Sequence, residues 1–153
     1  MKFFKESSNT KDYFMKDIEV RKSTVHGLGV FATADIPIHT CFEICPVICF
    51  SRELFHTHFH FHGSEHALVH YIFRWPDGQA AIALGFGSLY NHSIYPNAFF
   101  NLRENTQSLG IKFLAKKDIK AGEEILIKYH PDSSTLDFKD ENYFKNLKEI
   151  GIE

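Results

Sequence analysis

Hydrophobic and polar positions along the chain form short runs separated by turn residues, which predicts strands rather than long helices. The residues from Ile18 to Lys22 alternate in polarity and indicate a strand. Val25 to Ala32 places two glycines before an apolar run. The segment from Phe42 to Phe50 is apolar, but Pro46 lacks the N–H that a central strand needs. We therefore expect this segment to be bent or to lie at a sheet edge.

Two later pairs of segments have the pattern of β-hairpins. Val69 to Trp75 and Gln79 to Leu84 flank Pro76-Asp77-Gly78, a sequence strongly associated with tight turns. Ala98 to Leu102 and Gly110 to Ala115 flank a polar stretch. Each pair therefore predicts two adjacent antiparallel strands.

The last part of the chain predicts one more strand and a short C-terminal helix. The strand runs from Glu124 to Tyr129 and is entered through Ala121-Gly122. Asp140 can cap the helix, and Gly151 can end it. The apolar residues of this helix share one face: Tyr143, Phe144, Leu147 and Ile150.

Composition is that of an ordinary globular protein. Hydrophobic residues make up 44% and charged residues 24% of the 153 residues, which argues against disorder and coiled coils. No apolar run approaches the roughly 18 residues of a membrane-spanning helix, and the charged N-terminus has no signal-peptide stretch. The net charge of −2 argues against direct nucleic-acid binding. We therefore expect an intracellular protein, cytoplasmic or nuclear, that does not bind membranes.

The three cysteines, Cys41, Cys45 and Cys49, lie close together in the sequence. An odd number with this spacing suits neither a disulfide framework nor the common zinc and iron–sulfur sites. Free cysteine behaves as a small hydrophobic residue. We therefore expect buried or half-buried free thiols.

Histidines cluster in the middle of the chain. Four of them alternate and two follow at helical spacing: His56, His58, His60, His62, His66 and His70. Neutral imidazoles are the commonest metal ligands, so two or three could hold a metal. A solvated insertion without metal is the simpler interpretation, and we expect no metal.

Three polar motifs could carry chemistry. Gly27-Leu28-Gly29 makes either an ordinary turn or a backbone that a ligand can approach closely. Asn91-His92-Ser93, followed by Pro96-Asn97, suits either a turn or a polar ligand. Gly122-Glu123-Glu124 enters the segment that ends in Tyr129, and by itself it is typical of a structural turn.

The order of these motifs resembles the SET-domain family of protein lysine methyltransferases, in a short form without the cysteine-rich zinc site that often follows the last motif. The resemblance implies a mainly β fold of short curved sheets with a knot-like C-terminal threading. It also implies a single domain over residues 1–153, with a core of about 18–130 and a channel-closing segment of about 131–153. The implied methyl donor is S-adenosylmethionine. The implied partner is a protein substrate with an exposed lysine, such as a histone or another basic protein.

The resemblance also assigns roles to residues of this sequence. The implied cofactor-binding residues are His26, Gly27, Leu28, Gly29, Tyr90, Asn91, His92 and Tyr129. Tyr129 is also the implied catalytic tyrosine. The implied walls of the substrate channel are Phe100, Ile127, Phe138, Tyr143 and Phe144. Two departures from the family pattern bear on the substrate more than on the reaction: Lys128 stands where aspartate is common, and Ile44 stands where tyrosine is common after Glu43.

These residue types fit methyl transfer from a sulfonium to a lysine ε-amine. The amine must be neutral, whereas free lysine has a pKa of about 10.4. An apolar channel and the nearby sulfonium both disfavour the ammonium form. Alignment is then the main task, and the Tyr129 hydroxyl can serve it. The alternative is a SET-fold module that binds a protein tail without turnover, but the presence of Tyr129, Asn91 and His92 favours the enzyme.

In this family the number of methyl groups added depends on a hydroxyl that holds a water at the channel end. The two positions that can carry it are Ile127 and Phe100 here, and neither has a hydroxyl. The resemblance therefore implies di- or trimethylation, unless Tyr71, Tyr90 or Tyr95 supplies the hydroxyl.

Overall fold

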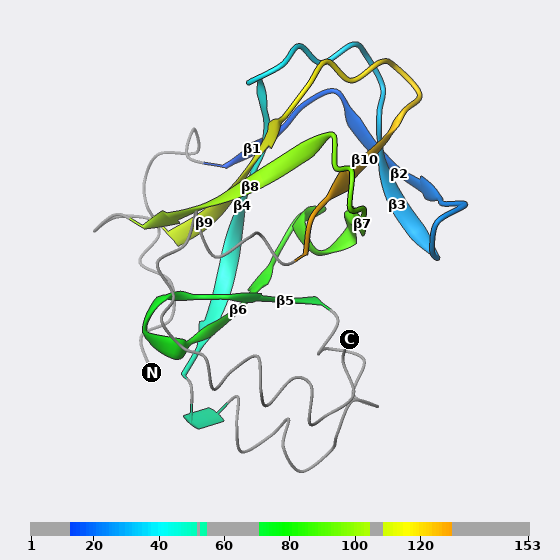
Figure 1. Ribbon diagram of the computed structural model, residues 1–153. Coiled ribbons are helices and arrows are strands. Elements are labelled where there is room, and N and C mark those ends of the chain that lie inside the picture. The colour runs from blue at the N-terminus through cyan, green and yellow to red at the C-terminus, as the bar shows by residue number, and fades with distance from the viewer. Residues whose placement is uncertain (1–12, 52, 55–70, 105–108, 130–153) are drawn as a thin grey trace. The chain divides into compact units, whose positions relative to one another are not determined.

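The computed structural model describes residues 13–51, 53–54, 71–104 and 109–129, and these residues form mainly short β-strands (Figure 1). The chain divides into two compact units. The first consists of Met1–Ile48 and Ile82–Lys128, and the second of Cys49–Ala81 and Tyr129–Glu153. The prediction of a mainly β fold is confirmed, whereas the single domain with a separate closing segment stays a prediction.

A four-stranded sheet in the first unit brings the sequence motifs together. Its strands are, in order, β2 (Ile18–Lys22), β3 (Leu28–Ala32), β10 (Glu124–Ile127) and β7 (Asn91–His92). β2, β3 and β10 pair antiparallel, whereas β7 runs parallel to β10. In Figure 1 the orange β10 lies beside the blue β3. The predicted strand over 18–22 is confirmed, and the strand predicted over 124–129 ends two residues earlier.

The larger sheet of this unit contains the hairpin predicted from Ala98 to Ala115. β8 (Ala98–Glu104) and β9 (Leu109–Ala115) pair antiparallel along their full length. β9 also pairs with β4 (Cys41–Phe50), and the short β1 (Phe14–Met15) pairs with β4. Along most of β4 and β9 buried side chains alternate with more exposed ones, as expected for strands, in which successive side chains point to opposite faces.

The Pro46 segment is predicted to be bent or to lie at a sheet edge, and the second of these alternatives is wrong. β4 has β9 on one side, and on the other it meets β1 and the backbone N–H of Leu84, which donates to the Pro46 carbonyl over 2.9 Å. Proline lacks only the N–H, so its carbonyl can still take part in the sheet. The irregularity expected of this segment is instead a shift of register between Cys41 and Glu43.

The hairpin predicted around Pro76-Asp77-Gly78 is also confirmed. In the second unit β5 (Ile72–Arg74) is followed by a 3-10 turn, η3 (Pro76–Gly78), and by β6 (Ala80–Ala83). The N–H of Trp75 donates to the carbonyl of Gln79 over 2.9 Å and closes the turn. β6 continues from the second unit into the first.

Hydrophobic side chains from both sheets fill the interior of the first unit. Phe42, Phe113, Ile111 and Ile125 are each at most 1% exposed. The three cysteines are thiols outside any disulfide: Cys45 is buried, and the other two are half-buried, as predicted. Burial raises the pKa of the Cys45 thiol to about 12, so this sulfur stays protonated and belongs to the apolar interior.

Two glycines at positive φ allow a test of how tightly the first unit is packed. Gly85 has φ of +69°, and a Cβ there would lie 2.7 Å from the Glu43 Oε1. Gly122 has φ of +89°, and apart from Gly122 and its two chain neighbours no atom of the described structure lies within 4 Å of the Cβ position. We expect Gly122→Ala to lower the free energy of unfolding by about 1 kcal/mol from backbone strain alone. Gly85→Ala adds the steric conflict, and we expect a loss of about 2–3 kcal/mol.

Urea denaturation of both variants measures this difference. Because both substitutions are the same and both backbones are left-handed, the difference isolates the contact with Glu43. Equal losses in the two variants would contradict the tight packing of Gly85.

Several predictions concern residues outside the described ranges. They are the C-terminal helix with the knot-like threading and the histidines from His56 to His70. Among the described residues, no helix is long and apolar enough to cross a membrane.

Candidate active site

β10 is the strand around which the three motifs assemble. On one side it pairs with β3, with Ile125 opposite Val30. On the other it pairs with β7, with Leu126 opposite Asn91. The glycine motif precedes and enters β3, and the asparagine-histidine motif is β7 itself. Motifs far apart in the sequence therefore lie on three adjacent strands.

The side chain of Asn91 holds the glycine turn. It is 6% exposed, and its amide nitrogen donates to the carbonyls of His26 and Leu28 over 3.1 Å each. The same nitrogen lies 2.8 Å from the Glu124 Oε1. The two N–H groups of one amide thus serve three acceptors. Asn91 therefore determines the path of the backbone between residues 26 and 28.

Glycine suits the two positions of this turn for different physical reasons. A Cβ at Gly29 would overlap the Glu124 carboxylate, so a larger residue there would push Glu124 away from Asn91 and Ser23. Gly27 has φ of +50°, and apart from Gly27 and its two chain neighbours no atom of the described structure lies within 4 Å of its Cβ position. The backbone at Gly27 is therefore open on that side, which leaves room for a ligand to approach it.

Ser23 and Glu124 complete the support of the turn, and the sequence motifs did not identify either residue as functional. The Ser23 hydroxyl accepts the N–H of Val25 over 2.8 Å and donates to the Glu124 Oε2 over 2.8 Å. Glu124 therefore accepts from Asn91 with one oxygen and from Ser23 with the other. The only sequence signal was a carboxylate in the glycine-glutamate turn, a position that is usually structural.

Asn97 fixes the strand that carries this carboxylate. Its amide nitrogen donates to the Glu124 carbonyl, and its amide oxygen accepts the N–H of Leu126, each over 2.8 Å. A side chain that makes both bonds acts as a short piece of neighbouring strand. Asn97 is 7% exposed and belongs to the support of the site.

Tyr90 points its hydroxyl into the interior. The side chain is 1% exposed, and the hydroxyl donates to the Glu43 Oε2 over 2.6 Å. Burial and the adjacent carboxylate raise the pKa of Tyr90 well above its usual value. Its predicted contact with the cofactor stays a prediction. His26, Leu28 and His92, predicted for the same role, are exposed.

Tyr129 belongs to the second unit and follows β10 by two residues. Its side chain is 45% exposed. Partial burial raises the pKa of its hydroxyl, and the electrostatic effect of Tyr71 raises it further. Tyr129 therefore keeps its proton across the neutral and mildly alkaline range.

The predicted channel residues are described only in part. Ile127 is 1% exposed at the end of β10. Phe100 is half-buried on β8, with its ring centroid 6.2 Å from that of Phe113. The other three, Phe138, Tyr143 and Phe144, lie outside the described residues. Within the described ranges, no three His, Cys, Asp or Glu side chains are arranged to hold a metal.

Comparison with known proteins matches this arrangement to one family. The model of the SET domain matches residues 27–130, which contain β3, β7 and β10. The chain belongs to the SET-domain family. It is a protein-lysine N-methyltransferase, and S-adenosylmethionine is its methyl donor.

Individual SET-domain relatives support the same assignment. A curated relative from Schizosaccharomyces pombe, "Histone-lysine N-methyltransferase, H3 lysine-37 specific", is 36% identical over 112 residues, which are 73% of this chain and 72% of the relative. The crystal structure of a Plasmodium falciparum protein, described as a candidate histone methyltransferase, is 30% identical with a TM-score of 0.62. It aligns over 76% of this chain and 96% of its own.

A larger assembly contains the same fold. Polycomb repressive complex 2 of Chaetomium thermophilum, in an autoinhibited conformation bound to S-adenosylmethionine, has a TM-score of 0.66 at 23% identity. The match covers 88% of this chain and 17% of the other. Together with the Plasmodium structure, it confirms the predicted SET-type fold of short curved sheets.

The described residues fit a methyl donor of this kind. S-adenosylmethionine carries a zwitterionic amino acid, an adenosine and a sulfonium, and so needs polar groups and an approachable backbone. The open side of Gly27 and the exposed His26 and His92 provide both in the first unit. When bound, S-adenosylmethionine supplies a methyl group that an amine can accept.

Glu124→Gln is expected to weaken the binding of S-adenosylmethionine about tenfold. The substitution replaces one carboxylate oxygen by an NH2 group, so either the Asn91 amide or the Ser23 hydroxyl loses its acceptor. Hydrogen bonds to charged groups contribute about 1.5–3 kcal/mol, and the turn should become less well ordered. Isothermal titration calorimetry of the folded variant measures the affinity.

Glu123→Gln is the matched control for this experiment. Glu123 is the neighbouring carboxylate, but it is exposed, and its Oε2 accepts the backbone N–H of Lys120 over 2.8 Å rather than supporting the Asn91 amide or the Ser23 hydroxyl. An unchanged affinity in Glu123→Gln is expected. If Glu124→Gln also bound like the wild type, the support that we assign to Glu124 would be wrong.

Proposed function

We propose that this enzyme methylates a lysine in a histone or another basic protein tail. The observation that carries the proposal is the 36% identity to a fungal enzyme named for H3 lysine 37, over most of both chains. The mild negative charge of this chain is compatible with a basic substrate. A histone substrate would place the enzyme in the nucleus.

The first unit is proposed to hold the cofactor through the turn from His26 to Gly29 together with Asn91 and His92. Asn91 supports this role because it fixes the carbonyls of His26 and Leu28. His92 supports it because the side chain is exposed while its backbone is anchored in β7 beside Ile127. Tyr90 is proposed to contribute through its backbone, since its hydroxyl is held by Glu43.

Tyr129 is proposed to be the catalytic residue. It follows the end of β10 by two residues, and the β10 backbone is fixed by Asn97 and by the N–H of Ser93, which donates to the Ile127 carbonyl over 2.9 Å. A neutral hydroxyl can accept a hydrogen bond from the lysine amine and direct its lone pair at the methyl carbon. The raised pKa of Tyr129 keeps this hydroxyl neutral while the amine loses its proton to water.

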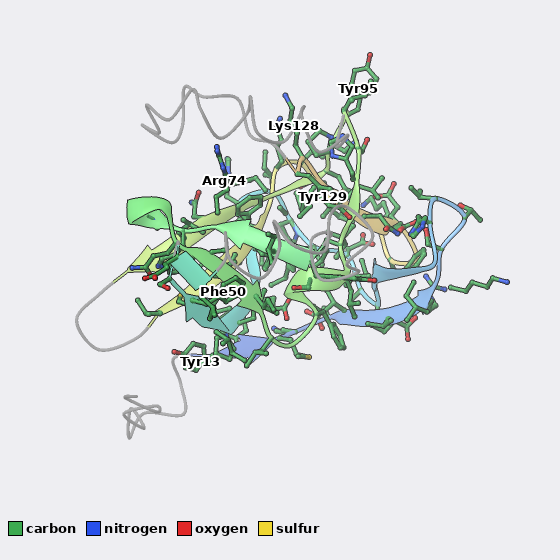
Figure 2. All side chains as sticks on the ribbon, turned by 90° about the horizontal axis from the view of Figure 1, so that it is seen from below. Tyr13, Phe50, Arg74, Tyr95, Lys128 and Tyr129 are labelled. Atoms are coloured by element: carbon green, nitrogen blue, oxygen red, sulfur yellow. The ribbon has the colours of Figure 1, made fainter. Side chains whose placement is uncertain are left out.

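We also propose that the product is di- or trimethyl-lysine. Ile127 and Phe100 carry no hydroxyl for a water at the channel end. Of the three tyrosines that could replace them, Tyr90 donates its hydroxyl to Glu43. Tyr95 is 82% exposed and points away from the strands in Figure 2. Tyr71 is the tyrosine whose electrostatic effect helps to raise the pKa of Tyr129, so it is the one to test if methylation stops at one group.

Turnover is expected to rise between pH 7 and pH 9. Only the neutral amine reacts, and the reference pKa of lysine is about 10.4, so each pH step below the lysine pKa increases the reactive fraction. The pKa of Tyr129 is raised, so its hydroxyl does not ionise in this window and does not cut the rise short. Single-turnover rates at saturating substrate measure the effect. A flat profile would show that amine deprotonation does not limit the reaction.

Incubation with methyl-labelled S-adenosylmethionine and separate histones tests the proposed substrate. Cytochrome c serves as a basic protein of similar charge, and Tyr129→Phe serves as the inactive enzyme. Mass spectrometry should locate the label on a histone lysine and count the methyl groups. Labelling of cytochrome c and histones alike would overturn the proposed selection of a protein tail. Tail binding without any labelling would favour the alternative, a non-catalytic module.

A further inference from the structure

The carboxylate of Glu43 lies buried between β4 and the segment that leads to Asn91. Its side chain is 0% exposed. Oε1 accepts the backbone N–H of Phe86 over 2.8 Å, and Oε2 accepts the hydroxyl of Tyr90 over 2.6 Å. One carboxylate therefore binds both ends of the Phe86–Tyr90 segment, which contains the 3-10 turn η4 (Gly87–Leu89) and directly precedes Asn91.

Close packing leaves this segment little freedom to shift. A Cβ on Gly87 would lie 2.6 Å from both the Ala83 Cβ and the Cys45 Sγ. The ring of Tyr90 lies 4.5 Å from that of Phe113, centroid to centroid, with an interplanar angle of 31°. The segment is thus pressed onto β4 and β9, and its two hydrogen bonds to Glu43 set where it lies along them.

The free-energy cost of burying the Glu43 carboxylate indicates a role beyond stability. Burial raises the pKa of Glu43, and the donors from Tyr90 and Phe86 oppose that rise. Among the described residues the donors to this carboxylate are the neutral Phe86 N–H and Tyr90 hydroxyl. A buried carboxylate held by neutral donors is expensive, and apolar side chains would fill such a place with less penalty. The contacts with Phe86 and Tyr90 have one shared consequence, which is the position of the residues that follow.

We propose that Glu43 is a positioning residue for methyl transfer, because by fixing both ends of the Phe86–Tyr90 segment it sets the position of the Asn91 amide against the glycine turn. The inference rests on the proposed cofactor role of Asn91. Successive residues of an extended chain point to opposite sides, so Tyr90 turned toward Glu43 directs Asn91 toward His26 and Leu28. A small displacement of such a support can lower activity by up to about 10²-fold.

Tyr90→Phe and Glu43→Gln test the proposal with little change in shape. Tyr90→Phe keeps the packing on Phe113 and removes only the donor to Glu43. Glu43→Gln keeps an acceptor for Phe86 and offers an NH2 group to the Tyr90 oxygen, so it should be the milder variant. We expect the affinity for S-adenosylmethionine to fall about tenfold in Tyr90→Phe and about threefold in Glu43→Gln, the scale of one lost hydrogen bond or less.

Two readouts separate positioning from a general loss of stability. Hydrogen exchange of the backbone amides from 86 to 92 should accelerate in both variants, at a temperature where each is fully folded. The double variant should bind S-adenosylmethionine no more weakly than Tyr90→Phe alone, because the two groups act as one unit. Ile119→Val is the control: Ile119 is 0% exposed in the same unit and pairs with Ile36, and this variant should change neither readout.

The affinities of these variants distinguish a failure of the role proposed for Glu43 from a failure of the cofactor role proposed for Asn91. Wild-type affinity in both Tyr90→Phe and Glu43→Gln, with a clear loss in Asn91→Asp, would overturn the role of Glu43 and leave the cofactor role of Asn91 in place. Wild-type affinity in all three variants would overturn both. Losses of equal size in the Ile119→Val control would show that Glu43 acts through stability alone and would overturn positioning.

Discussion

Replacing Tyr129 by phenylalanine is expected to lower the rate of methyl transfer by about 10²-fold or more, the scale of losing a positioned polar group in an active site. The substitution removes one hydroxyl and almost no volume. The side chain is 45% exposed, so the fold should not depend on it. Affinity for S-adenosylmethionine should change little, because the groups proposed to hold it are mainly in the first unit. Single-turnover labelling at saturating cofactor and substrate measures the chemical step.

Tyr95→Phe is the matched control for this experiment. Tyr95 is 82% exposed and loses the same hydroxyl, so turnover should stay at the wild-type rate. Near-normal turnover in Tyr129→Phe would contradict the catalytic role of Tyr129. A parallel loss of cofactor affinity would instead assign the hydroxyl to binding.

Asn91→Asp is expected to reduce the affinity for S-adenosylmethionine by about 10²-fold. The two side chains have the same shape, but aspartate has no N–H to donate. Its carboxylate would face the carbonyls of His26 and Leu28 and the carboxylate of Glu124, all of which accept hydrogen bonds from Asn91. Each buried acceptor left without a donor costs about 1–3 kcal/mol, and the like charge of Glu124 adds repulsion. Calorimetric titration of the folded variant measures the affinity.

Asn101→Asp provides the control for charge, because Asn101 is exposed on β8 and takes the same substitution. It should bind the cofactor like the wild type. Thermal unfolding without ligand must accompany both titrations, since Asn91→Asp is also expected to destabilise the turn. An Asn91→Asp protein that is folded and binds normally would remove Asn91 from the proposed site.

The local sequence pattern determined most of the strands. Alternation over 18–22 and the Pro76-Asp77-Gly78 turn predicted β2 and the β5–β6 hairpin, because side-chain period and turn geometry are local properties. The order of the motifs predicted the family. The number and spacing of the cysteines also predicted that Cys41, Cys45 and Cys49 are thiols outside any disulfide.

The direction of the polar side chains was decided only by the tertiary structure. Tyr90 and Asn91 are adjacent in the sequence, yet their side chains point in different directions. The Tyr90 hydroxyl binds Glu43 in the interior, whereas the Asn91 amide binds the glycine turn. Pro46 predicted a bent or edge strand, and the structure places it in the sheet interior, where its carbonyl accepts the N–H of Leu84. The sequence placed Glu124 in a motif that is by itself typical of a structural turn, and it gave neither Glu124 nor Glu43 a role in supporting the site.

The physical reason is the range of the interactions. Strand formation and turns depend on neighbours within a few residues, whereas the contact of Asn91 with His26 spans 65 residues and that of Tyr90 with Glu43 spans 47. The pairing of β10 with β3 and β7 brings these partners together, and a polar group must find its partner there once it is buried. The sequence by itself therefore determined the strands and the family, and the tertiary structure decided which side chains support the site.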